Sequence, residues 1–62
     1  MRRRRLLAYL RSHNCTLIRE GSRHSWWGNA ENDRRSAVPR HTETHDLLAR
    51  KICRDFGIPP PP

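Results

Sequence analysis

The residues best suited to chemistry lie in the segment Gly21–Trp27, which reads Gly-Ser-Arg-His-Ser-Trp-Trp. Gly21 and Ser22 are typical of a tight two-residue turn, and the residues after them are typical of a short strand. His24 is the one side chain here that exchanges a proton near neutral pH. An arginine precedes it and two tryptophans follow it. The segment could therefore hold a phosphodiester backbone and move a proton.

The alternation of side chains along this strand separates its residues into two sets. His24 and Trp26 should point to one face of a sheet, and Ser25 and Trp27 to the other. If Trp27 packs beneath helices, His24 and Trp26 lie on the open face. Such a face suits RNA, because arginine holds phosphate, tryptophan stacks a base and histidine shuttles a proton. Taken alone, His24 could also be an ordinary surface histidine.

Other side chains could bind the same backbone. The candidates for clamping a phosphate are Arg19, Arg23, Arg35 and Arg40, with Ser22 as a hydrogen-bond donor. His41 follows Val38-Pro39-Arg40 and is either a second base or a polar residue ahead of a helix. His41 and His45 are four residues apart, but no carboxylate or cysteine completes a zinc set at a familiar spacing. We therefore expect no metal.

Several common enzyme classes find no support in the chain. It contains no G-x-x-x-x-G-K-[S/T], no G-x-G-x-x-G and no G-x-S-x-G motif. These patterns are typical of phosphate-binding loops, dinucleotide-binding folds and serine esterases. Their absence argues against a nucleotide-using enzyme or an esterase, and we expect no cofactor.

Length and charge restrict the kind of partner. The chain has 62 residues, enough for one small domain, and 34% of them are hydrophobic. Its 13 basic and 6 acidic residues give a net charge of +7, and all but one of the basic residues are arginine. Arginine binds phosphate bidentately and stacks on bases. The partners should therefore be anionic: nucleic acid, an acidic protein, or both.

The cysteines and the N-terminal segment bear on the compartment. Cys15 and Cys53 form no C-x-x-C pair and accompany no secretory signal, so we expect small buried residues in a reducing cytoplasm. Residues 1–10 imitate a signal peptide, but their apolar run is short and Arg11 interrupts it. No apolar run is long enough to cross a membrane.

Periodicity predicts a helix, three strands and a second helix. The first helix covers residues 3–13, with Leu6, Leu7 and Leu10 on one face, and Asn14 stops it. The predicted strands cover residues 15–20, 23–27 and 34–38, with Pro39 ending the third.

The second helix should begin at a threonine cap and end at a glycine. Thr42 or Thr44 can supply the cap. Leu48, Ile52 and Phe56 then form an inward stripe, with Leu47 and Cys53 beside it, and Gly57 followed by Ile58 and Pro59 ends the helix. The economical packing for this order is α+β, with two helices on one face of a three-stranded antiparallel sheet. We expect one domain over residues 1–58 and a disordered proline tail over residues 59–62.

With these pieces in order, residues 4–58 resemble the HicA family of bacterial toxins, the mRNA interferases of type II toxin–antitoxin systems. The resemblance rests on a first helix before Leu17-Ile18-Arg19-Glu20, then Gly21-Ser22-Arg23-His24, then Val38-Pro39-Arg40-His41 before the last helix. It implies an α-β-β-β-α fold like that of double-stranded-RNA-binding domains. It also implies that His24 is catalytic and that a HicB-type antitoxin covers the active face. Thr44 and His45 depart from the aliphatic and polar residues expected there, which puts the packing in question.

The expected activity is therefore metal-independent cleavage of mRNA. One histidine removes a proton from the RNA 2′-hydroxyl, and arginines, Ser22 and Trp26 hold the strand. Two alternatives stay open. The same basic sheet could serve a non-catalytic RNA-binding module, or the chain could be a structural peptide associated with the ribosome.

Overall fold

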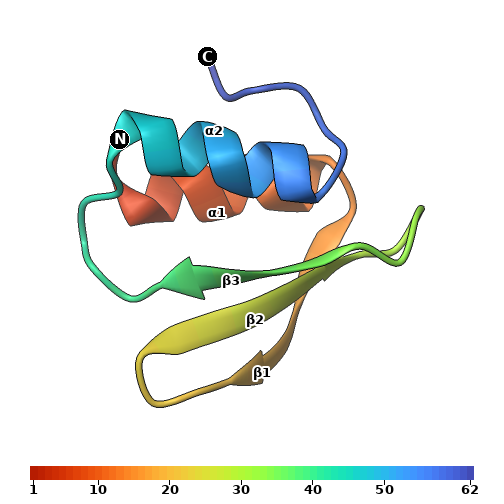
Figure 1. Ribbon diagram of the computed structural model, residues 1–62, viewed down its shortest axis with the longest axis horizontal. Coiled ribbons are helices and arrows are strands. Elements are labelled where there is room, and N and C mark those ends of the chain that lie inside the picture. Colours follow the sequence, from red (N-terminus) through yellow and green to blue (C-terminus); the bar gives the residue numbers. More distant parts are fainter.

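The computed structural model describes residues 1–62 and contains five elements. They are α1 (Arg3–Ser12), β1 (Cys15–Glu20), β2 (His24–Asn29), β3 (Arg35–Pro39) and α2 (Asp46–Asp55). The strands form an antiparallel sheet of order β1-β2-β3. Both helices lie side by side on one face of it (Figure 1). The predicted α-β-β-β-α order and layering are confirmed.

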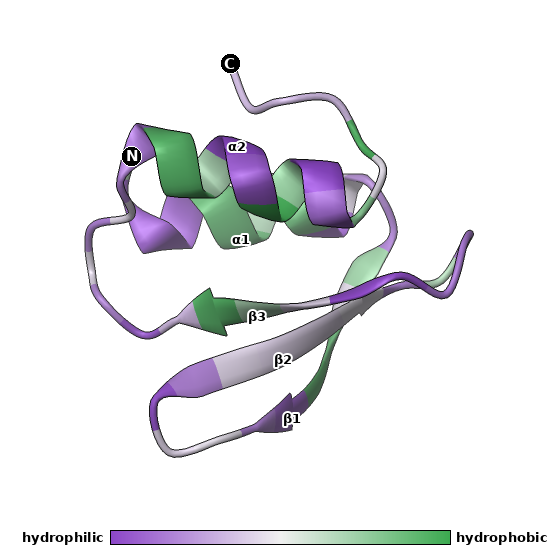
Figure 2. Ribbon diagram, in the orientation of Figure 1, coloured by the Kyte–Doolittle hydropathy of each residue, from purple (hydrophilic) through white to green (hydrophobic).

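The core lies between the helices and the sheet. Its residues come from every element, and Figure 2 shows hydrophobic segments within both helices, in β1 and near the end of β3. The buried apolar side chains are Leu6, Leu10, Cys15, Trp27, Val38, Ala49, Ile52, Cys53 and Phe56. Both cysteines are unpaired and buried, as predicted. Burial raises the pKa of the Cys53 thiol to about 11, so this thiol stays protonated near neutral pH.

The inward face of α2 differs from the predicted stripe. Ala49, not Leu48, faces the core with Ile52 and Phe56, and Leu48 is 37% exposed. Spacings of three and four residues alternate along a buried helix face, whereas steps of four alone drift around the helix. The prediction of Leu48 as a core residue was therefore wrong by one position.

The start of α2 also differs from prediction. The cap is His45, whose Nδ1 accepts a hydrogen bond from the Leu47 amide at 3.2 Å. Thr44 is buried instead, and its amide donates to the Met1 carbonyl at 2.7 Å. The Arg3 amide donates to the Thr42 carbonyl at 2.8 Å. Neither threonine caps the helix, because residues 42–44 run alongside the N-terminus.

The strand boundaries shift slightly from those predicted. β2 continues to Asn29 because Gly28 and Asn29 remain paired with Thr16 and Cys15. β3 includes Pro39 as its last residue, at the edge of the sheet, where a missing amide donor is tolerated. The first helix ends at Ser12, one residue before the predicted end, with Asn14 in the left-handed region at φ 66°.

Residues 59–62 leave the end of α2 and pass the first helix. The Tyr9 hydroxyl donates to the carbonyls of Pro59 and Pro60 at 2.8 and 3.2 Å. These contacts place the start of the tail beside α1. The expected disorder of the tail stays a prediction.

The end of α2 yields a stability prediction. Gly57 has φ +70°, and an added Cβ would lie 3.1 Å from both the Arg34 guanidinium and the Asn32 amide. Gly57→Ala should therefore destabilise the fold by about 1–2 kcal/mol. Thermal unfolding followed by circular dichroism measures this as a midpoint lower by roughly 4–16 °C. Gly57→Asn is the matched control, because asparagine tolerates this conformation better. An alanine variant as stable as the wild type would contradict the prediction.

Candidate functional site

Strand β2 separates its side chains as predicted. Ser25 and Trp27 face the helices and are 0% and 2% exposed. His24 is exposed, and Trp26 is 40% exposed on the opposite face. Because both helices lie on the Trp27 side, the other side of the sheet is bare (Figure 1). We call this bare side the open face; its residues are Thr16, Ile18, Arg19, His24, Trp26, Gly28, Arg35, Ala37 and Pro39.

A groove on the open face brings three of the predicted RNA-binding residues together. Its lining residues are Ile18, Arg19, Trp26 and Arg35, and its volume is about 200 Å³. Trp26 is paired with Arg19 of β1 on one side and with Ala37 of β3 on the other. The indole therefore lies between two strands that each supply a guanidinium group. This arrangement can stack a base and hold the phosphates beside it.

An irregularity in β1 explains why Arg19 lies in this groove. Leu17 pairs with Trp27 on the helix side, and in a regular strand Arg19 would share the face of Leu17. The register shifts between them, so that Arg19 pairs with Trp26 instead. A bulge of this kind re-aims the following side chain to the other face. The sequence shows no signal for this bulge, because it depends on pairing with β2.

The loop before His24 is longer than predicted. Residues 21–23 connect the strands, and the Gly21 amide donates to the His24 carbonyl at 2.8 Å. The prediction of a two-residue turn was therefore wrong. An added Cβ on Gly21 would lie 3.0 Å from the His24 carbonyl oxygen. Glycine thus allows the loop backbone to approach the start of β2 closely, while Ser22 and Arg23 are exposed next to His24.

Arg40 and His41 lie at the same end of the sheet as His24 but outside the groove. Pro39, the residue before Arg40, is the register partner of His24. The Arg40 guanidinium donates to Oε1 of Glu20 at 3.0 Å and lines a cleft against α1. His41 is exposed in the connection to α2. Of the predicted phosphate ligands, Arg19 and Arg35 line the groove, Arg23 lies in the loop before His24, and Arg40 is paired with Glu20.

A polar network beneath His24 was not predicted. The Arg3 guanidinium donates to Oγ of the buried Ser25 at 2.7 Å and to the Pro39 carbonyl at 2.8 Å. The Ser25 hydroxyl in turn donates to Oε1 of Glu20. This bond, followed by the charges of Arg40 and Arg3, holds the pKa of Glu20 below its usual range. The network ties α1 to the ends of β1, β2 and β3, and so fixes the backbone that carries His24.

Removal of the Glu20 charge should change how stability depends on pH. Because the folded pKa of Glu20 is lowered, its charge stabilises the fold above the unfolded value of about 4.3. That contribution is lost as the pH falls through the folded pKa. Glu20→Gln should therefore lower the urea midpoint near neutral pH, and the difference from wild type should close in acid. Glu31→Gln is the matched control, because Glu31 accepts a hydrogen bond only from the exposed Asn14 side chain. A difference that persists unchanged in acid would contradict this role.

Comparisons with known proteins add no relative. A scan against protein-family models, a search of curated proteins and a search of solved structures each found no match. The structure brings no three His, Cys, Asp or Glu side chains into an arrangement that could hold a metal ion. Neither helix has the length and hydrophobicity needed to cross a bilayer.

Proposed function

We propose that this chain is an endoribonuclease that binds single-stranded mRNA on the open face and uses His24 for proton transfer. One observation carries the proposal. The uncovered side of the sheet combines an exposed histidine, a half-exposed indole, and two arginines that line a groove together with the indole. Trp26 and His24 are two residues apart on the same strand face, which suits a base stacked beside the reacting phosphate.

The reaction that fits this side-chain set uses the RNA as its own nucleophile. His24 removes the proton from a 2′-hydroxyl, and the 2′-oxygen attacks the adjacent phosphorus. The bond from phosphorus to the 5′-oxygen breaks, the 5′-oxygen takes up a proton from solvent, and His24 releases the proton that it removed to solvent. The products are a 2′,3′-cyclic phosphate and a 5′-hydroxyl. Arg19 and Arg35 stabilise the negative charge on the phosphate, and no cofactor takes part.

The biological setting that we propose is a toxin–antitoxin system. The support is the resemblance to the HicA family in the segments around His24 and Arg40, together with the α-β-β-β-α order of the elements. In this setting the protein acts in the cytoplasm. An acidic HicB-type antitoxin would cover the open face and neutralise part of the +7 charge.

Chemically modified RNA tests the proposed reaction. An RNA that carries 2′-O-methyl groups has no 2′-hydroxyl proton to lose, so it should bind the protein but resist cleavage. The unmodified RNA of the same sequence is the matched control and should give fragments that end in a 2′,3′-cyclic phosphate. Mass spectrometry of the fragments distinguishes this end from a 3′-hydroxyl. Equal cleavage of both RNAs would overturn the mechanism.

A non-catalytic RNA-binding module is the second candidate. The observation that favours it is the groove itself, because its lining residues, Ile18, Arg19, Trp26 and Arg35, include no histidine. Stacking on Trp26 and contacts from two arginines would bind RNA without any proton transfer. Tight RNA binding without cleavage by the purified protein would favour this candidate.

A further inference from the structure

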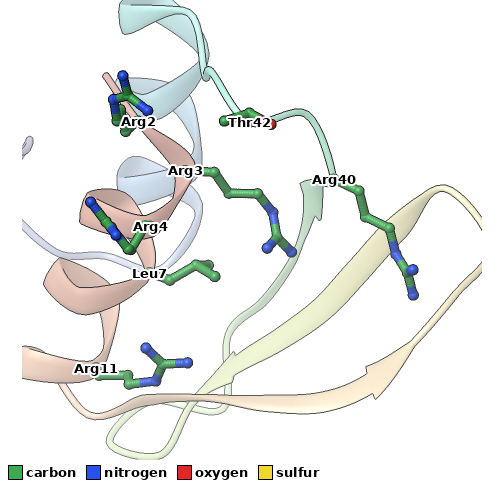
Figure 3. Close-up of a pocket in the computed structure, with 7 residues that line it drawn as sticks. All are labelled: Arg2, Arg3, Arg4, Leu7, Arg11, Arg40 and Thr42. Carbon is green, nitrogen blue, oxygen red and sulfur yellow. The ribbon is translucent and has the colours of Figure 1, made fainter.

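A second basic surface lies on the helix side of the sheet. A cleft of about 480 Å³ is open between α1 and the connection that follows β3. We call it the arginine cleft; its lining residues are Arg2, Arg3, Arg4, Leu7, Arg11, Arg40 and Thr42. Figure 3 shows the Arg3 and Arg11 side chains extending from α1 toward the sheet, and the Arg40 side chain extending from the end of β3 across the sheet. Five arginines therefore line one cleft.

The cleft is built by the fold and not by one charged segment. Arg4, Leu7 and Arg11 are three and four residues apart, so they share one face of α1. Arg3 is held by hydrogen bonds to Ser25 and Pro39, and Arg11 lies 5.2 Å from the ring centroid of the buried Trp27. These contacts order two of the five arginines before any ligand binds.

The positive charge of the cleft is poorly compensated within the protein. Glu20 is the one carboxylate paired with a lining side chain, through Arg40 at 3.0 Å. The other ion pairs of the chain join Met1 to Glu43 and Asp46, and Lys51 to Asp55. Arg2, Arg4 and Arg11 thus have no carboxylate partner. The N-terminus of α1 adds positive potential at the same place. A cluster of this kind favours an anionic ligand.

The lining favours phosphate over the carboxylates of a protein partner. Protein interfaces are anchored by buried apolar and aromatic side chains, and the cleft has only Leu7 of this kind. Guanidinium groups match phosphate oxygens through two parallel hydrogen bonds, as they match carboxylates, so the sparse apolar lining decides between the two. The cleft also begins near His24, because Arg40 follows Pro39 and Pro39 pairs with His24.

We propose that the arginine cleft binds backbone phosphates of the same RNA strand that crosses the open face. The strand would pass around the end of the sheet where β2 begins and β3 ends. This proposal rests on the proposed binding of RNA, but not on its cleavage. It assigns the arginines of α1 to substrate binding and gives the protein a longer RNA footprint than the open face alone.

The salt dependence of RNA binding tests the cleft. Each phosphate contact to single-stranded nucleic acid contributes roughly 0.7 to the slope of log K against log salt concentration. Arg4→Gln with Arg11→Gln should therefore reduce that slope by about 1.4. The matched control is Arg5→Gln with Arg54→Gln, which has the same net charge but changes exposed arginines outside the cleft. Fluorescence anisotropy with a 2′-O-methyl RNA measures binding without cleavage.

The outcomes separate this proposal from the proposed function. A shallower slope for the cleft pair alone supports the cleft, whether or not the wild type cleaves RNA. Equal slopes for the two pairs overturn the cleft, even if His24 proves essential for cleavage. If Arg11→Gln lowers the unfolding midpoint, the single variant Arg4→Gln is compared with Arg5→Gln instead. The expected difference between their slopes is about 0.7. Inorganic polyphosphate and polyglutamate of equal charge are then tested as competitors of RNA binding. Stronger competition by polyphosphate supports a phosphate site, and equal competition by both contradicts it.

Discussion

Replacement of His24 by alanine should lower the rate constant of RNA cleavage by about 10²–10⁴-fold, the usual contribution of general acid–base catalysis. RNA affinity should change little, because Arg19, Trp26 and Arg35 form the groove without His24. The fold should also persist, because the His24 side chain is exposed and lies at the first residue of β2. Single-turnover cleavage, anisotropy and thermal unfolding measure the three quantities.

His41→Ala is the matched control for this change. It removes another exposed histidine at the same end of the sheet, two residues beyond the partner of His24 in β3. We expect this variant to keep cleavage within the range of the wild type. If His41→Ala abolishes cleavage and His24→Ala does not, the assignment of the proton-transfer residue is wrong.

Trp27→Ala should strongly destabilise the fold. Trp27 is the largest fully buried side chain, is 2% exposed, and belongs to the core between the sheet and the helices. Large-to-small changes of this type cost about 3–5 kcal/mol. A domain of this length has a total stability of roughly 3–9 kcal/mol. Urea unfolding followed by far-UV circular dichroism should therefore show a midpoint lowered by about a third or more.

The neighbouring Trp26→Ala is the contrasting variant. Its side chain lies on the open face, so the unfolding midpoint should change much less. RNA binding should weaken by about 1–3 kcal/mol through the loss of base stacking. Nε1 of Trp27 is buried without a hydrogen-bond partner. Trp27→Phe keeps an aromatic ring in the core but removes this donor, so it separates the effect of ring packing from the effect of the indole N–H. Equal stability losses in Trp26→Ala and Trp27→Ala would contradict the two-face arrangement of β2.

Local patterns were enough to predict most of the fold. The period of two in β2 predicts that Ser25 and Trp27 face inward and that His24 and Trp26 face outward. Asn14 and Gly57 are residue types that accept a left-handed backbone, and both end a helix at positive φ. These features depend on neighbours in the chain, so the sequence contains them.

The features that were missed depend on contacts between distant segments. The bulge at Ile18 exists only in the pairing of β1 with β2, and the burial of Thr44 follows from its hydrogen bond to Met1. From the sequence alone, the arginines near the N-terminus are expected on the solvated face of a helix. The fold brings them opposite Arg40, and this juxtaposition creates the arginine cleft.

The most direct test of the central claim incubates the purified wild-type protein with a labelled single-stranded RNA in EDTA. Anisotropy reports the fraction of RNA bound, and a denaturing gel of the same sample reports cleavage. The proposed function predicts binding together with cleavage that the chelator leaves unchanged and that His24→Ala removes. Saturated binding with intact RNA, or cleavage of equal rate by His24→Ala, would contradict it.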